Sequence, residues 1–103
     1  MEEVKIIREL FLGFIKLHIL YHASKEDVCG VFLSEELSRH GYDISPGTLY
    51  PALHALERAE YLQQENKVVD GRQRKYYRAT ASGIIALENG KKQAVELINE
   101  ISE

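Results

Sequence analysis

Short and hydrogen-bonding side chains gather where a helix is expected to begin. A serine followed by a proline, Ser45-Pro46, predicts a helix start with Ser45 as the N-cap and Pro46 in the first helical position. Side chains near the start of such a helix can reach the edges of DNA bases in the major groove. We expect the residues nearest to DNA to be Ser45, Gly47, Thr48, Tyr50, Pro51 and His54.

A second stretch suited to nucleic acid is basic. Positive charges are densest at Arg72, Arg74, Lys75 and Arg78. Basic side chains neutralise backbone phosphates, and this supplies affinity for DNA without reading its sequence. We expect Arg72, Arg74 and Lys75 to hold phosphates or the adjacent minor groove. The alternative interpretation is a solvated basic turn on an unrelated small fold.

The net charge of −3 argues at first against a nucleic-acid partner, but the charge is unevenly distributed. Residues 37–80 carry a net charge of +2, whereas residues 1–36 carry −3 and residues 81–103 carry −2. A phosphate-binding surface needs only a local basic stripe. The distribution is therefore compatible with a double-stranded DNA partner.

Helices and one hairpin must position these residues. Helices are expected over residues 3–23, 31–40, from 46 onward and 81–101, and strands over 62–69 and 73–79. Asp70-Gly71 between the strands is a strong hairpin signal, and Gly41 is a natural stop for the second helix. Two short helices followed by a basic hairpin describe a winged helix-turn-helix. The fold class is α+β, mostly helical, with a C-terminal dimerisation helix.

The third helix has a predicted inward stripe at Leu49, Leu53 and Leu56. Pro51 is awkward in this helix, because a proline past the first turn removes a backbone hydrogen bond and can distort the helix start. Asn89-Gly90 is expected to weaken the middle of the last helix.

The first helix is apolar on more sides than one small core can cover. Ile7, Phe11 and Phe14 mark one stripe, and Leu10 and Leu17 belong to another. We therefore expect part of this helix, together with the last helix, to meet a second copy of the chain. This divides the chain into a DNA-binding domain at residues 1–79, which includes the first helix, and a dimerisation helix at residues 80–103.

Two motifs in register resemble those of the PadR family of transcription regulators. The first is Ser45-Pro46-Gly47-Thr48-Leu49-Tyr50-Pro51-Ala52-Leu53, followed by Leu56-Glu57. The second is Gly71-Arg72-Gln73-Arg74-Lys75-Tyr76-Tyr77-Arg78, followed by Thr80 and Gly83. The resemblance implies a winged-helix homodimer joined through its first and last helices. It also implies repression of nearby genes, often relieved by a small aromatic or cationic effector.

The chain departs from the family pattern at two points. The family usually has glycine where Glu60 stands, so the exit from the third helix is expected to differ. The sequence contains no tryptophan, and this argues against a multidrug-type effector held between two indole rings. The single C-terminal helix is similar to that of the short subfamily.

Other candidate sites are weaker. His18 and His22 have metal-ligand spacing, but no sequence cluster of Cys or Asp supplies further ligands, so core or interface histidines are expected and no metal or cofactor is predicted. Cys29 has no basic neighbour that would lower its pKa, and it is expected to be a buried small residue. No hydrolase motif, phosphate loop or dinucleotide fingerprint is present, so the chain is not expected to be an enzyme.

The sequence thus predicts a sequence-specific, double-stranded DNA-binding regulator, acting as a homodimeric repressor on a pseudo-palindromic site. The acidic start and the single cysteine favour a cytoplasmic protein and give no sign of a membrane partner. Two rival interpretations remain open. One is a winged-helix module that binds protein, and the other is a small-molecule sensor with little DNA binding.

Overall fold

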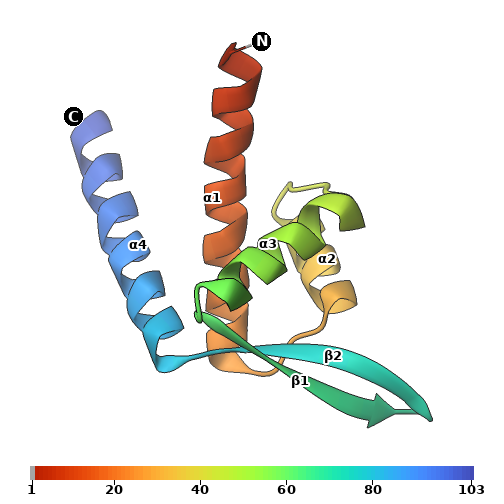
Figure 1. Cartoon of the computed structure of the whole chain (residues 1–103). Coiled ribbons are helices and arrows are strands. Elements are labelled where there is room, and N and C mark those ends of the chain that lie inside the picture. The colour runs from red at the N-terminus through yellow and green to blue at the C-terminus, as the bar shows by residue number, and fades with distance from the viewer. Residues whose placement is uncertain (1) are drawn as a thin grey trace.

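The computed structural model describes residues 2–103, with side chains from residue 5 onward. The elements in chain order are α1 (Glu2–Lys25), α2 (Gly30–Arg39), α3 (Pro46–Arg58), β1 (Leu62–Val69), β2 (Arg72–Ala79) and α4 (Ala81–Ile101). This is the predicted order, with element ends within two residues of those expected. In Figure 1, α1 and α4 run side by side, α2 and α3 lie on the other side of α1, and the hairpin projects away from the helices. The fold is a winged helix-turn-helix followed by one long helix.

The turn between α2 and α3 is set by Gly41, which has the left-handed φ of 90° that glycine adopts without strain. The backbone N–H of Gly41 donates to the carbonyl of Ser38, and that of Tyr42 donates to Leu37. These bonds satisfy carbonyls at the end of α2 and turn the chain toward α3. The predicted stop at Gly41 is confirmed.

The wing is a two-stranded antiparallel hairpin in which Leu62 pairs with Ala79 and Val69 with Arg72. Asp70 and Gly71 form its two-residue turn, with φ values of 52° for Asp70 and 76° for Gly71. Val28, between α1 and α2, exchanges backbone hydrogen bonds of 2.9 and 2.7 Å with Tyr77. The sequence analysis did not anticipate this bridge, which attaches the base of the wing to the helix-turn-helix.

The core lies where α1, α2, α3 and the base of the wing converge. The inward stripe of α3 is buried as predicted, with Leu49, Leu53 and Leu56 each no more than 5% exposed. The other large buried side chains come from α1, α2, the segment between them and the hairpin: Ile15, Ile19, Leu20, Val28, Leu33, Leu37, Leu62 and Tyr77. Pro51 lies inside α3, which nevertheless runs unbroken from Pro46 to Arg58.

The exit from α3 is joined to the start of α4. Glu60 takes a left-handed φ of 64°, so the exit keeps the conformation that glycine would favour, contrary to the expected difference. The carbonyl of Glu60 accepts hydrogen bonds from the hydroxyls of Thr80 (2.6 Å) and Ser82 (3.0 Å). Thr80 also caps α4 by accepting a 3.0 Å hydrogen bond from the backbone N–H of Gly83.

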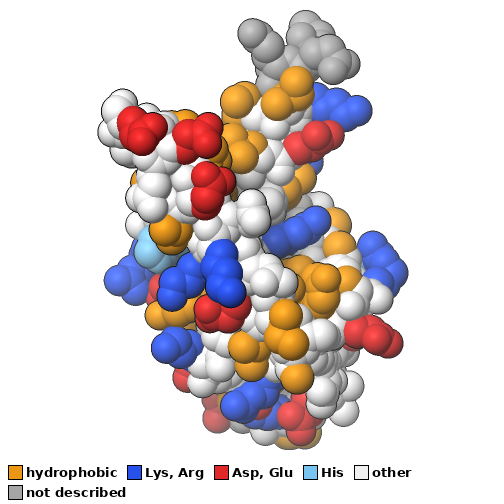
Figure 2. All heavy atoms as spheres, turned by 90° about the vertical axis from the view of Figure 1, so that its left-hand side faces the viewer, with side chains coloured by type: hydrophobic (Ala, Val, Ile, Leu, Met, Phe, Trp, Pro, Cys, Tyr) orange, Lys and Arg blue, Asp and Glu red, His pale blue; other side chains and the backbone are white. Residues whose placement is uncertain are grey.

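The two long helices pack against each other at Gly90, where a Cβ would meet the side chain of Leu17. Glycine at this position lets α4 approach α1, and α4 continues through it without a break. Much of both helices stays uncovered, and Figure 2 shows hydrophobic side chains at the surface among basic and acidic ones. The exposed apolar residues of these helices include Ile6, Ile7, Leu10, Phe11, Phe14, Ile84, Ile85, Val95, Leu97, Ile98 and Ile101. Within the described residues, none of the helices has the length and apolar character needed to cross a membrane.

Candidate nucleic-acid interface

The outward face of α3 carries the side chains that the sequence analysis assigned to DNA. Thr48 is half-buried, and the rest of the assigned set is exposed: Ser45, Gly47, Tyr50, Pro51 and His54. The inward leucines fix this orientation, since they turn the opposite face of the helix to solvent. The exposed hydroxyl, imidazole and phenol groups are hydrogen-bonding groups of the kind that contact bases and phosphates.

Ser45 is the N-cap residue of α3, but its side chain makes no capping hydrogen bond. Its backbone carbonyl accepts 3.0 Å bonds from the N–H groups of Thr48 and Leu49, and its hydroxyl lies 3.5 Å from that of Thr48. The prediction of Ser45 as the N-cap residue is confirmed, but its hydroxyl does not supply the hydrogen bond that usually accompanies this position. The positive end of the helix dipole lies here, so this end of α3 is suited to an anion such as a phosphate.

The wing carries Arg72, Arg74 and Lys75 as exposed residues. Strand alternation places Arg72 and Arg74 on one face of the hairpin and Lys75 on the other. None of the three forms an ion pair within the part of the chain that the structure describes. Their charges are therefore free to meet phosphates.

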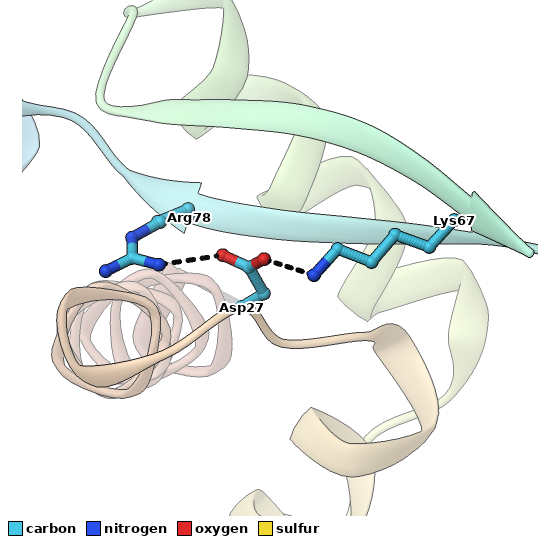
Figure 3. A network of polar contacts seen from close by, with 3 residues as sticks. All are labelled: Asp27, Lys67 and Arg78. Carbon is cyan, nitrogen blue, oxygen red and sulfur yellow. Dashed lines mark hydrogen bonds and ion pairs between the residues drawn. The ribbon is translucent and has the colours of Figure 1, made fainter. Parts of the chain in front are cut away.

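Two other basic residues of the wing have a different role. Asp27, which follows α1, accepts hydrogen bonds from Lys67 of β1 and from Arg78 of β2, the latter at 3.2 Å (Figure 3). The Lys67 side chain also lies over the ring of Tyr76, 5.1 Å from its centroid. The hydrogen bond from Lys67, together with the nearby Arg78, lowers the pKa of the Asp27 carboxyl. Asp27 thus ties both strands of the wing to the end of α1.

A groove of about 230 Å³ connects α3 with the wing. Tyr50 of α3 and Arg74 and Lys75 of β2 line it, together with Cys29 and the start of α2. A Cβ on Gly30 would collide with the phenol of Tyr50, so the glycine leaves the space in which this ring lies. Cys29 is half-buried rather than fully buried as expected, and it forms part of the groove wall. Side chains assigned from two separate motifs therefore share one groove.

A smaller hollow of about 160 Å³ on the other flank of α3 adds two basic residues that the sequence analysis missed. Gly47, Thr48 and Pro51 line it beside Arg8 and Lys16 of α1. The eight-residue spacing of Arg8 and Lys16 puts them on one side of α1, but nothing in the sequence shows which side faces α3. Arg8 and Lys16 therefore lie on one flank of α3, and the basic residues Arg74 and Lys75 of the wing lie on the flank that carries Tyr50.

This geometry has the parts of a DNA-binding winged helix, and comparison with known proteins agrees. The family model described as "Transcriptional regulator PadR-like family" matches residues 19–89. The chain belongs to the PadR-like family. The match includes α2, α3, the wing and the first part of α4, so this PadR-like regulator has the family's two characteristic motifs in one folded unit.

Relatives of this PadR-like regulator agree in sequence and in structure. It is 50% identical over 95 residues to the protein named "Transcriptional regulator Rv3488" from Mycobacterium tuberculosis, with 92% of this chain and 89% of that protein covered. A PadR family transcriptional regulator from Eggerthella lenta is 29% identical, with a TM-score of 0.82 over 96% of this chain and 88% of the other. A PadR-like regulator from Bacillus cereus, also 29% identical, has a TM-score of 0.78 over 95% and 93% of the two chains. These names are those of transcriptional regulators rather than enzymes.

Proposed function

We propose that this PadR-like regulator binds double-stranded DNA in a sequence-specific manner and acts as a homodimeric repressor. The observation that carries the proposal is the shared groove, in which Tyr50 of α3 lies beside Arg74 and Lys75 of the wing. A helix in the major groove and a basic hairpin beside it can engage one stretch of duplex together. The local positive charge of this face offsets the overall acidity of the chain.

The residues divide into two roles. Ser45, Gly47, Thr48, Tyr50, Pro51 and His54 lie in or beside the major groove, where exposed polar groups can read base edges. Arg72, Arg74 and Lys75 hold phosphates or the minor groove and position the protein on the duplex. Neither role involves bond-making chemistry, and no enzymatic activity is proposed.

A homodimer is supported by the apolar surface that α1 and α4 leave uncovered. Ile7, Leu10 and Phe14 on α1 and Leu97 and Ile98 on α4 are between 37% and 56% exposed. A contiguous surface of this kind favours a protein partner. In the proposed dimer residues 1–79 bind DNA and residues 80–103, with α1, join the two copies. Two-fold symmetry then requires a pseudo-palindromic site with half-sites about one helical turn apart.

A small-molecule sensor is the second candidate. A hollow of about 520 Å³ between α1 and the start of α3 is lined by Ile7, Phe11 and Ile15 and by Asp43. Its apolar wall suits a small aromatic compound, and Asp43 and Arg8 add one charge of each sign to the lining. A thermal-shift screen with such compounds tests this candidate, because a ligand of the folded state raises the melting temperature by mass action.

The proposed DNA binding is tested by fluorescence anisotropy with a labelled duplex from upstream of the protein's own gene and unlabelled random duplex as competitor. We expect binding that survives an excess of random duplex and weakens steeply with salt. A folded dimer that binds neither duplex at low salt would favour the protein-interaction module instead. If unlabelled random duplex displaces the labelled duplex completely, the result would contradict sequence specificity.

A further inference from the structure

Three of the four histidines come together away from the DNA-binding face. His18 and His22 lie one turn apart on α1, and His40 is the C-cap residue that follows α2. One ring nitrogen from each can be chosen so that all three lie within 4.8 Å of one another. The rings of His18 and His40 are stacked, with their centroids 4.8 Å apart.

The surroundings of these rings suit an ion. A hollow of about 340 Å³ is lined by the three imidazoles and by aromatic and aliphatic side chains, among them Phe14 and Tyr42. Nε2 of His22 is buried and has no hydrogen-bond partner. Buried polar atoms are seldom left unpaired, and an absent ion is one of the recognised reasons for it. The Glu36 carboxylate, which also pairs with Arg39 at 2.9 Å, lies 3.9 Å from this nitrogen.

We propose that His18, His22 and His40 bind a divalent transition-metal ion, with Glu36 as the carboxylate beside His22. Imidazole suits Zn²⁺ and its neighbours, and three histidines with one open position form a known zinc ligand set. Tetrahedral bonds of the usual length bring the nitrogens to about 3.3 Å from one another, so the rings approach by at most about 1.5 Å. Because Glu36 lies on the side of the unpartnered Nε2, its carboxylate would place a negative charge beside the bound cation.

The bound ion would join α1 to the end of α2, next to the turn that leads into α3. His40 donates its backbone N–H to Leu37, and Tyr42, whose ring lies 5.4 Å from that of His18, follows two residues later. A metal bridge at this point would hold the helix-turn-helix against α1. The expected result is a more stable folded state in the presence of the metal.

The test is isothermal titration of the full-length, tag-free protein with Zn²⁺, using the variants His18→Ala, His22→Ala and His40→Ala. We expect the original protein to bind one ion per chain. Each of the three variants should bind Zn²⁺ with an affinity lower by about ten-fold or more. The matched control is His54→Ala, which removes the fourth histidine, exposed on α3 and outside the cluster. This control is expected to bind Zn²⁺ as the original protein does.

His40 is exposed, so His40→Ala is the variant that least disturbs packing, and it decides the matter if the α1 variants fold poorly. Zn²⁺ should raise the melting temperature of the original protein, reversibly with a chelator, but not that of His40→Ala. Co²⁺ should give the visible absorption of four-coordinate cobalt only when the three histidines are intact. Absence of Zn²⁺ binding by the original protein, or equal binding by His40→Ala, would overturn the proposal.

Discussion

The hydroxyl of Thr80 donates a 2.6 Å hydrogen bond to the backbone carbonyl of Glu60, joining the end of α3 to the start of α4. The hydroxyl oxygen of Thr80 also accepts a hydrogen bond from the backbone N–H of Gly83. The backbone N–H of Thr80 donates to the carbonyl of Tyr61 at 3.0 Å. Thr80 therefore forms hydrogen bonds with backbone groups at the end of α3, at the base of the wing and at the start of α4. The position of α4 relative to α3 depends on it.

Replacing Thr80 should weaken this junction. Thr80→Val keeps the shape of the side chain and loses the hydroxyl hydrogen bonds to Glu60, Ser82 and Gly83, so the free energy of unfolding should fall by about 1–2 kcal/mol. Urea denaturation followed by circular dichroism measures the change. Thr80→Ser retains the hydroxyl and is the matched control, expected within about 0.5 kcal/mol of the original protein. Equal losses in the two variants would contradict the assigned hydrogen bonds.

Gly83 should not tolerate a side chain. A Cβ at this position would collide with the backbone carbonyl of Tyr61, which cannot swing away as a flexible side chain can. Gly83→Ala is therefore expected to lower the free energy of unfolding by about 1–3 kcal/mol. At Gly13 of α1 no atom lies within 4 Å of an added Cβ. Gly13→Ala should instead stabilise the helix by about 0.5–1 kcal/mol. If both variants lost stability, the close approach of Gly83 to Tyr61 would not be the cause of the loss at Gly83.

The ion pairs of Asp27 with Lys67 and Arg78 should make the stability of the fold depend on pH. Hydrogen bonds from Lys67 and Arg78 lower the folded-state pKa of Asp27 below its ordinary value of 3.8. A depressed carboxylate pKa stabilises the fold above the unfolded value, and this contribution is lost as the pH falls through the folded pKa. Asp27→Asn should therefore be less stable than the original protein at neutral pH, with the difference shrinking in acid. Thermal melts at several pH values measure it, and a constant difference would contradict the account.

His54 should contribute to sequence discrimination. It is exposed on the outward face of α3, with its ring centroid 6.5 Å from that of Tyr50. If its imidazole contacts a base, His54→Ala should reduce the ratio of specific to random affinity by about 1–3 kcal/mol and leave random binding nearly unchanged. Competition anisotropy with both duplexes gives the two affinities. Equal loss on both would place His54 at the backbone rather than at a base.

Local sequence patterns predicted the elements well because each had its own signal. Gly41 and Asp70-Gly71 take the left-handed backbone that their residue types favour, and Thr80 is a residue type that commonly caps helices, as it does at α4. Glu60 takes the same left-handed backbone without such a signal. Its carbonyl is held by Thr80 and Ser82, which are distant in sequence, and no local pattern reveals bonds of that kind.

The same limit applies to the sites. Tyr50 and Arg74 were assigned separately, but their shared groove depends on the placement of β2 beside α3 and the start of α2. Arg8 and Lys16 could not be placed near α3 before the packing of α1 was known. His40 was missed beside His18 and His22 because metal-ligand spacing along one helix gives no information about a residue at the end of another. Side-chain periodicity indicates which face is buried, and not what that face meets.

The most direct test of the DNA-binding face is the salt dependence of affinity for Arg74→Ala. Arg74 is exposed and forms no ion pair within the described residues, whereas Arg39 on α2 pairs with Glu36 at 2.9 Å and serves as the charge-matched control. We expect Arg74→Ala to weaken binding to specific and random duplexes alike and to reduce the slope of log affinity against log salt by about one. Arg39→Ala should leave the slope unchanged. An unchanged slope in Arg74→Ala would contradict the placement of the wing on DNA phosphates.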